Sequence, residues 1–188
     1  MNLPNIITIV RILLIPVFVV IFLMANSWSY LAAATLFALA AATDWLDGYL
    51  ARKLNQTTPF GAFIDPVADK LIVVSALVIL IAHHSSIWLT LPSLVIIGRE
   101  IVISALREWM AEMNSSVTIA VSYLGKIKTT LQMIAITILL SYPPVMTSLW
   151  VQIGYLMLYL AAVMTLWSMT QYLRAAWPSL RVGLNPKK

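Results

Sequence analysis

Four aspartates that lie close together are the residues of this chain best able to do chemistry. They are its only aspartates and fall within 26 positions, at Asp44, Asp47, Asp65 and Asp69. Residues three or four positions apart share one face of a helix, so each successive pair points from one helix in one direction. Two facing pairs of carboxylates give the oxygen-rich coordination that Mg²⁺ or Mn²⁺ prefers. Zinc is disfavoured, because the chain has no cysteine and its two histidines, His83 and His84, lie far from the acids. We therefore expect the four aspartates to be ligands of divalent cations.

The elements that carry these acids are predicted to be transmembrane helices. The chain of 188 residues is 61% hydrophobic and 10% charged, with a mean hydropathy of +0.91, which excludes a soluble globular protein. Ionisable groups at membrane depth normally face a bundle interior or a water-filled cavity. We expect an all-α integral membrane protein, a six-transmembrane-helix bundle with a polar active-site cavity. Its apolar stretches, each near the roughly 20 residues that cross a bilayer, are Ile6–Met24, Tyr30–Leu46, Asp65–Ala82, Trp88–Leu106, Ile119–Leu140 and Leu149–Leu173.

The whole chain, 1–188, is predicted to be a single membrane domain. The breaks between the apolar stretches are short and carry turn residues such as Asn, Ser and Pro. The sequence has no internal repeat, no low-complexity tract and no linker long enough to separate two domains. One compact helical bundle is the expected architecture.

The distribution of charge predicts how the bundle is oriented. The breaks at 25–29, 83–87 and 141–148 contain no Lys, Arg, Asp or Glu, whereas the other ends of the apolar stretches contain them all. By the positive-inside rule, both termini and the aspartates face the cytoplasm. His83 and His84 then fall in an outer loop, where we expect them to be solvated. The formal net charge of +5 suits anionic lipid headgroups, and we expect no nucleic-acid partner.

The aspartates belong to a longer pattern, D-x-x-D-G-x-x-A-R-x₈-G-x-x-x-D-x-x-x-D, that runs from Asp44 to Asp69. This pattern resembles the signature of the CDP-alcohol phosphotransferases at every defined position. Three further motifs resemble the bacterial members of that family that make phosphatidylglycerophosphate. They are Asn5-x-x-Thr8-x-x-Arg11, Arg99-Glu100 with Leu106-Arg107-Glu108, and Gly125-Lys126-x-Lys128-Thr129. The resemblance therefore extends over nearly the whole chain.

The resemblance implies a phosphatidyl transfer. The hydroxyl of sn-glycerol 3-phosphate would attack the lipid-linked phosphorus of CDP-diacylglycerol, releasing CMP and giving phosphatidylglycerophosphate. Two Mg²⁺ or Mn²⁺ ions would neutralise charge on the phosphate oxygens. By similarity to the family, Asp69 is the candidate general base, although the sequence does not separate this role from that of a ligand. The resemblance also implies a homodimer in the bacterial cytoplasmic (inner) membrane, in contact with membrane lipids.

The CDP-diacylglycerol site is expected on the first helix and within the signature. Small residues leave room for a pyrophosphate and a cytosine against the helix backbone, and they equally suit close helix packing. Arg52 could contact a phosphate or anchor the helix at the inner interface. The candidate CDP-diacylglycerol contacts are Asn5, Thr8, Gly48, Ala51, Arg52 and Gly61.

The acceptor carries its own phosphate, so a second basic cluster is expected. Arg99 and Arg107 are offset by about 80° on an ideal helix and could flank one cavity, and their guanidinium groups match phosphate geometry. Lys126 could reach the same cavity from the next helix. Lys128 points away from Lys126 and could bind lipid headgroups instead, while Glu100 could orient Arg107.

Other functions remain open from sequence alone. Inositol phosphate, serine or phosphatidylglycerol could replace glycerol 3-phosphate as the acceptor, although the basic cluster favours a phosphorylated acceptor over serine. A cation transporter would explain buried aspartates but not the Gly, Ala and Arg between them. A noncatalytic membrane scaffold has no reason to carry four acids. A metal-dependent phosphatidyltransferase is the interpretation that accounts for the whole pattern.

Overall fold

The chain folds into six α-helices and, in the part of the chain that is described, no β-strand. The computed structural model describes residues 3–53, 58–112 and 123–184, without the side chains of 3–4, 44–53, 62, 111–112, 123–124, 126, 178–180 and 182–184. The helices are α1 Leu3–Leu23, α2 Ser27–Lys53, α3 Pro59–His84, α4 Ile87–Glu112, α5 Tyr123–Ser141 and α6 Leu149–Leu184. The predicted all-α, six-helix bundle is confirmed.

Three of the helices are long and apolar enough by themselves to cross a membrane, counting only the described residues. Their apolar segments are Asn5–Leu23, Ile87–Met110 and Leu149–Trp177, and shorter apolar segments occupy Ser27–Thr43 in α2 and Ile127–Ser141 in α5. The polar residues of the signature interrupt the apolar character of α2 and α3. A helix of this kind is stable in a membrane when its polar part faces its neighbours.

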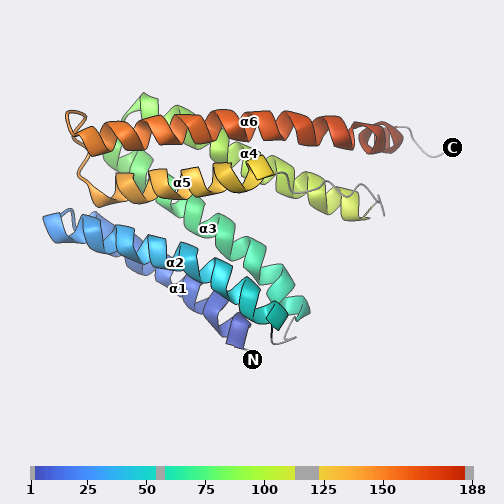
Figure 1. The fold of residues 1–188 in the computed structure, drawn as a ribbon, viewed down its shortest axis with the longest axis horizontal. Helices are drawn as coiled ribbons and strands as arrows, with labels where there is room; N and C mark the ends of the chain where they lie inside the picture. The colour runs from blue at the N-terminus through green and yellow to red at the C-terminus, as the bar shows by residue number, and fades with distance from the viewer. Residues whose placement is uncertain (1–2, 54–57, 113–122, 185–188) are drawn as a thin grey trace.

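The helices form two groups that meet through α3 and through a direct contact between α2 and α5 (Figure 1). Helices α1 and α2 pack against each other, and α4, α5 and α6 lie together on the other side of the bundle. Helix α3 starts beside α1 and runs obliquely to α4. Because the helices alternate in direction, α1, α3 and α5 begin at the end of the bundle where α2, α4 and α6 finish. We call this the charged end, and the opposite one the uncharged end.

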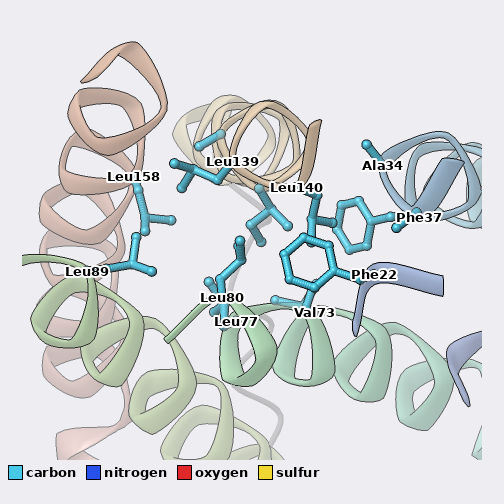
Figure 2. Close-up of a cluster of buried hydrophobic side chains, with 14 of the residues drawn as sticks. Phe22, Ala34, Phe37, Val73, Leu77, Leu80, Leu89, Leu139, Leu140 and Leu158 are labelled. Carbon is cyan, nitrogen blue, oxygen red and sulfur yellow. The ribbon is translucent and has the colours of Figure 1, made fainter. Parts of the chain in front are cut away.

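The hydrophobic core fills the half of the bundle nearer the uncharged end. All six helices contribute to it, and Figure 2 shows Phe22, Phe37, Leu77, Leu89 and Leu158 among the side chains that meet there. Each of these five side chains is at most 1% exposed. Burial of such side chains stabilises the folded state by about 1.5–3 kcal/mol each relative to exposure in water. This packing fixes the helices relative to one another, so their polar ends at the charged end are held in place.

Local sequence explains both ends of α3. The Thr58 side chain caps its first turn by accepting a hydrogen bond from Gly61 N at 3.0 Å, and Pro59 follows with the backbone angle that a first helical position favours. At the other end, Ser85 adopts a left-handed conformation with φ of 45°, which terminates the helix. The aspartates at 65 and 69 therefore lie inside α3, two to three turns from its start.

The histidines at the uncharged end differ from the prediction. His83 and His84 are the last residues of α3 rather than loop residues, and both side chains are half-buried. His83 Nε2 lies 2.9 Å from Tyr30 Oη on α2, and His84 Nδ1 lies 3.1 Å from Tyr155 Oη on α6. The expectation of solvated histidines was wrong, because α3 continues two residues beyond its apolar stretch and both histidines contact tyrosines of neighbouring helices.

Candidate active site

A buried polar stripe on α1 faces the start of α3. Asn5, Thr8 and Arg11 are 7%, 0% and 1% exposed, in a helix whose other residues are almost all apolar. Their spacing of three residues keeps them on one side of the helix. Buried polar groups are costly unless they are hydrogen-bonded, and each of these three bonds to α3 or to its capping residue.

Two of these bonds hold the carboxylates of α3. Thr8 Oγ1 donates to Asp65 Oδ1 at 2.7 Å, and Arg11 Nη1 donates to Asp69 Oδ1 at 2.6 Å. The buried Arg11 thus has a counter-ion, which a charge out of water requires. The Asp69 side chain is 45% exposed, so a ligand can still approach it. Helix α1 therefore fixes the orientation of both carboxylates while leaving Asp69 accessible.

Gly61 lies where the backbone of α3 comes closest to Asn5. Asn5 Nδ2 donates to Thr58 Oγ1 at 3.0 Å, and a Cβ on Gly61 would lie 2.7 Å from Asn5 Oδ1 and 3.2 Å from Thr58 Oγ1. Real side chains do not tolerate the first of these distances. The helix position thus requires glycine for the Asn5–Thr58 contact to form, and this close approach joins α1 to the first turn of α3.

The other half of the signature lies on α2. Its backbone is helical from Ser27 to Lys53, which places Asp44 and Asp47 on one face as expected. The side chains of Asp44, Asp47, Gly48, Ala51 and Arg52 lie outside the described residues, so their roles stay predictions. Among the described side chains no group of three or more His, Cys, Asp or Glu gathers in one place. The described part of the predicted metal site consists of Asp65 and Asp69.

The donor set at this place fits a hard divalent cation. Asp65 and Asp69 are one helical turn apart on α3, and each presents a carboxylate whose orientation is fixed by a hydrogen bond from α1. Carboxylate oxygens are the ligands that Mg²⁺ and Mn²⁺ prefer, and hydrogen bonds such as those from Thr8 and Arg11 orient carboxylates for ligation. The geometry is therefore compatible with the predicted metal site.

A second group of charges links α4, α5 and α6. Lys128 on α5 is 5% exposed, donates to Ser168 Oγ on α6 at 3.0 Å, and lies close enough to Arg99 and Arg107 to interact with both electrostatically. The Arg107 guanidinium carbon lies 5.6 Å from the centre of the Tyr172 ring. Three cationic side chains thus lie in one region, and their charge favours the binding of an anion there.

Glu100 is the acid within this group, and its partner differs from the one expected. Arg99 Nη1 donates to Glu100 Oε1 at 2.7 Å, whereas the sequence suggested that Glu100 orients Arg107. Arg99 is adjacent to Glu100 in the chain, whereas Arg107 lies two turns further along α4. Arg99 Nε is buried and has no hydrogen-bond partner in the described part of the structure. Arg99 Nε is thus a donor that no described residue uses and that is shielded from solvent in this conformation.

The structure describes Lys128, which was not among the predicted acceptor contacts, and leaves the predicted contact Lys126 untested. The side chain of Lys126 lies outside the described residues, so its predicted role stays open. The sequence left open whether Lys128 binds lipid headgroups, and in the structure it is buried between α5 and α6. A lysine buried inside a membrane bundle marks a candidate functional site. Its spacing from Gln132 and Ile136, both buried on α5, could have revealed it from sequence.

Arg11 and Thr58 are further residues of this region whose contacts the sequence did not reveal. The motif Asn5-x-x-Thr8-x-x-Arg11 suggested contacts with the nucleotide, and the structure adds that these side chains bind α3. Thr58 lies in a break between two apolar stretches of the sequence, and in the structure it is the N-cap of α3. Partners on different helices are not visible in local spacing.

Comparison of the sequence with known proteins points to one family. Residues 1–167 match the family model described as CDP-alcohol phosphatidyltransferase. A protein of Pseudomonas fluorescens is 59% identical over 183 residues, covering 96% of this chain and 93% of its own. Proteins of Escherichia coli strain K12 and Shigella flexneri serotype 5b are each 52% identical over 176 residues, covering 93% of this chain and 94% of theirs. All three are named CDP-diacylglycerol--glycerol-3-phosphate 3-phosphatidyltransferase. On this evidence the chain belongs to the CDP-alcohol phosphatidyltransferase family.

Proposed function

We propose that this protein transfers the phosphatidyl group of CDP-diacylglycerol to sn-glycerol 3-phosphate, releasing CMP and forming phosphatidylglycerophosphate. The observation that carries the proposal is the pair of oriented carboxylates on α3, held by Thr8 and Arg11, within a family signature. The names of relatives at 52–59% identity point to the same reaction. The buried cations on α4 and α5 suit a phosphorylated acceptor.

Asp44, Asp47, Asp65 and Asp69 are the residues that would hold divalent cations, Mg²⁺ or Mn²⁺, with two ions expected. When bound, such ions neutralise charge on the phosphate oxygens and on the departing CMP. Thr8 and Arg11 keep the α3 carboxylates in the orientation that ligation needs. Gly48, Ala51, Arg52 and Gly61 line the expected place of the nucleotide, and Asn5 and Thr8 lie beside it on α1.

The reaction is a direct displacement at phosphorus. The acceptor hydroxyl oxygen forms a bond to the phosphorus that carries diacylglycerol, and the bond from that phosphorus to the CMP oxygen breaks. The hydroxyl proton passes to a carboxylate, for which the half-exposed Asp69 is the candidate. Asp69 as ligand, as base or as both remain alternatives within this mechanism.

The acceptor phosphate is proposed to bind the cations of α4 and α5. Arg99, Arg107 and Lys126 were the expected contacts, and the burial of Lys128 beside the two arginines adds it to the set. Guanidinium groups form paired hydrogen bonds to phosphate, and a buried ammonium adds charge. Serine has no phosphate to engage this cluster, which favours glycerol 3-phosphate; inositol phosphate and phosphatidylglycerol remain alternatives.

We infer from the charge pattern that the charged end of the bundle faces the cytoplasm. Lys and Arg are absent from the connections at the uncharged end, as the positive-inside rule predicts for the outer side. The protein would then lie in the bacterial cytoplasmic membrane with both termini inside. A homodimer is proposed from the family resemblance.

The test is an assay of CMP release by purified protein with CDP-diacylglycerol and Mg²⁺. Glycerol 3-phosphate, inositol phosphate, serine and phosphatidylglycerol are offered separately as acceptors. We expect release with glycerol 3-phosphate and phosphatidylglycerophosphate as the product. Faster turnover with another acceptor would reassign the substrate, and metal-dependent cation flux without CMP release would favour the transporter alternative.

A further inference from the structure

The last turns of α6 reach beyond the thickness of a bilayer. The helix runs for 36 residues from Leu149 to Leu184, which at 1.5 Å per residue is about 54 Å. The hydrocarbon core is about 30 Å thick and the whole bilayer about 40–45 Å. The apolar segment of α6 ends at Trp177. The rest of the helix therefore lies at the level of the headgroups or beyond it, at the charged end of the bundle (Figure 1).

Two tryptophans indicate the depth of this segment. Trp150 and Trp177 are both 51% exposed, and their separation of 27 positions along α6 corresponds to about 40 Å. That distance matches the separation of the two headgroup layers, where tryptophan is enriched. Arg174 and Arg181 lie about one turn on either side of Trp177. Both guanidinium groups are thus placed near the depth of the lipid phosphates.

Arg174, Trp177 and Arg181 form one face with a hollow beside it. The spacing of three and four residues places them on the same side of α6, and all three are exposed. A cavity of about 360 Å³ is lined by Leu173, Arg174 and Trp177. The Arg181 guanidinium carbon lies 5.6 Å from the centre of the Trp177 ring. The apolar hollow is therefore bordered by the cation Arg174, and a second cation, Arg181, lies one turn beyond Trp177.

The charge of this segment selects the kind of ligand. No Asp or Glu follows Glu112 in the chain, whereas Arg174, Arg181 and four lysines do, two of them at positions 187 and 188. Such a surface attracts anions, and at the depth of the headgroups the abundant anion is a lipid phosphate. A zwitterionic lipid brings an ammonium group that the arginines repel. A lipid with net negative charge is the better match.

We propose that this face of α6 is a binding site for an anionic phospholipid of the membrane. Its phosphate lies between Arg174 and Arg181, and its glycerol backbone and upper acyl chains lie against Leu173 and Trp177. The site lies outside residues 1–167, which match the family, and shares no residue with the proposed catalytic region. It therefore stands independently of the proposed function.

The test measures lipid binding to the full-length chain by native mass spectrometry. Phosphatidylglycerol and phosphatidylcholine with identical acyl chains are titrated separately, and the dissociation constant of the first bound lipid is determined. Arg174→Ala combined with Arg181→Ala should weaken phosphatidylglycerol binding about 25-fold, from about fivefold per basic residue near a membrane surface. Phosphatidylcholine binding should hardly change. The corresponding Lys double variant should lose less, because it keeps both charges.

Two controls make the result decisive. Lys187→Ala combined with Lys188→Ala removes the same charge from the same terminal segment and should leave the phosphatidylglycerol affinity nearly unchanged. Gln171→Ala, at an exposed position of α6, controls for surface substitution alone. Wild-type affinity in the Arg double variant would overturn the site. An equal loss in the terminal Lys variant would overturn it too, because attraction would then be diffuse. A fall for both lipids alike would argue against charge selection.

Discussion

The residue that most deserves a functional test is Arg11, because it connects α1 to the proposed catalytic carboxylate. Its guanidinium is buried and bonds to Asp69 at 2.6 Å. Removing the partner of a metal ligand typically costs 10- to 100-fold in metal affinity or activity. Arg11→Ala should therefore lower kcat by roughly that factor and raise the Mg²⁺ concentration needed for half-maximal CMP release.

The conservative change Arg11→Lys separates charge from geometry. Lysine keeps the positive charge and loses the planar fork, so we expect activity between those of Arg11→Ala and the unchanged protein. Thr8→Val tests the weaker, uncharged contact to Asp65 and should have a smaller effect. If Arg11→Ala showed the unchanged dependence on Mg²⁺ together with normal turnover, Arg11 would serve packing alone.

Lys128 allows a prediction about the acceptor. A lost charged contact to phosphate is worth about 1.5–3 kcal/mol, or roughly 10- to 150-fold. Lys128→Ala should raise the KM for glycerol 3-phosphate by an amount in this range and the KM for CDP-diacylglycerol much less. Steady-state kinetics with each substrate varied in turn checks this. Equal effects on both constants would show that Lys128 stabilises the packing of α5 against α6 instead.

At the scale of the elements, Gly61 tests the contact between α1 and α3. Gly61→Ala would place a methyl group 2.7 Å from Asn5 Oδ1, and overpacking of this kind costs about 1–3 kcal/mol. We expect a lower midpoint of thermal unfolding and reduced activity. Gly98→Ala is the matched control, since a Cβ at Gly98 meets nothing within 4 Å; it should be neutral or slightly stabilising.

Asn5→Ala distinguishes this clash from a general effect of alanine. Combined with Gly61→Ala, it removes the atom that the new methyl group would meet, so the double variant should be more stable than the sum of the two single changes predicts. Additive losses would show that the close approach of Gly61 to Asn5 does not limit the contact between these helices.

The sequence predicted elements better than the contacts between them. Long apolar runs are local patterns, so the six helices could be predicted directly. The cluster at 44–69 is also a local pattern, and the site that it predicts stays a prediction. The pairing of Arg11 with Asp69 spans 58 positions and depends on how α1 packs against α3. The end of α3 was misjudged because Ser85 adopts a left-handed conformation that sequence assigns mainly to glycine or asparagine. The sequence alone therefore did not predict the contacts between distant helices or the unusual backbone conformation at the end of α3.

At the scale of the whole molecule, the division of the bundle into two halves supports its proposed chemistry. The uncharged half packs as a hydrophobic core, and it leaves the other half to hold charges that water or substrates must reach. The oriented carboxylates lie on α3 beside α1, whereas the cations lie on α4 and α5. Two substrates can therefore be bound by separate sets of helices, with α3 connecting them.

Such an arrangement predicts that both substrates are bound before reaction. The chain has no cysteine, and His83 and His84 lie at the opposite end of α3 from its aspartates. A covalent phosphatidyl-enzyme would then require an aspartate that is already proposed as a metal ligand. We expect sequential kinetics, inversion of configuration at phosphorus, and no exchange of labelled CMP into CDP-diacylglycerol without acceptor. Exchange in the absence of acceptor, or retention with a chiral phosphorus substrate, would establish a covalent intermediate and remove Asp69 from the role of general base.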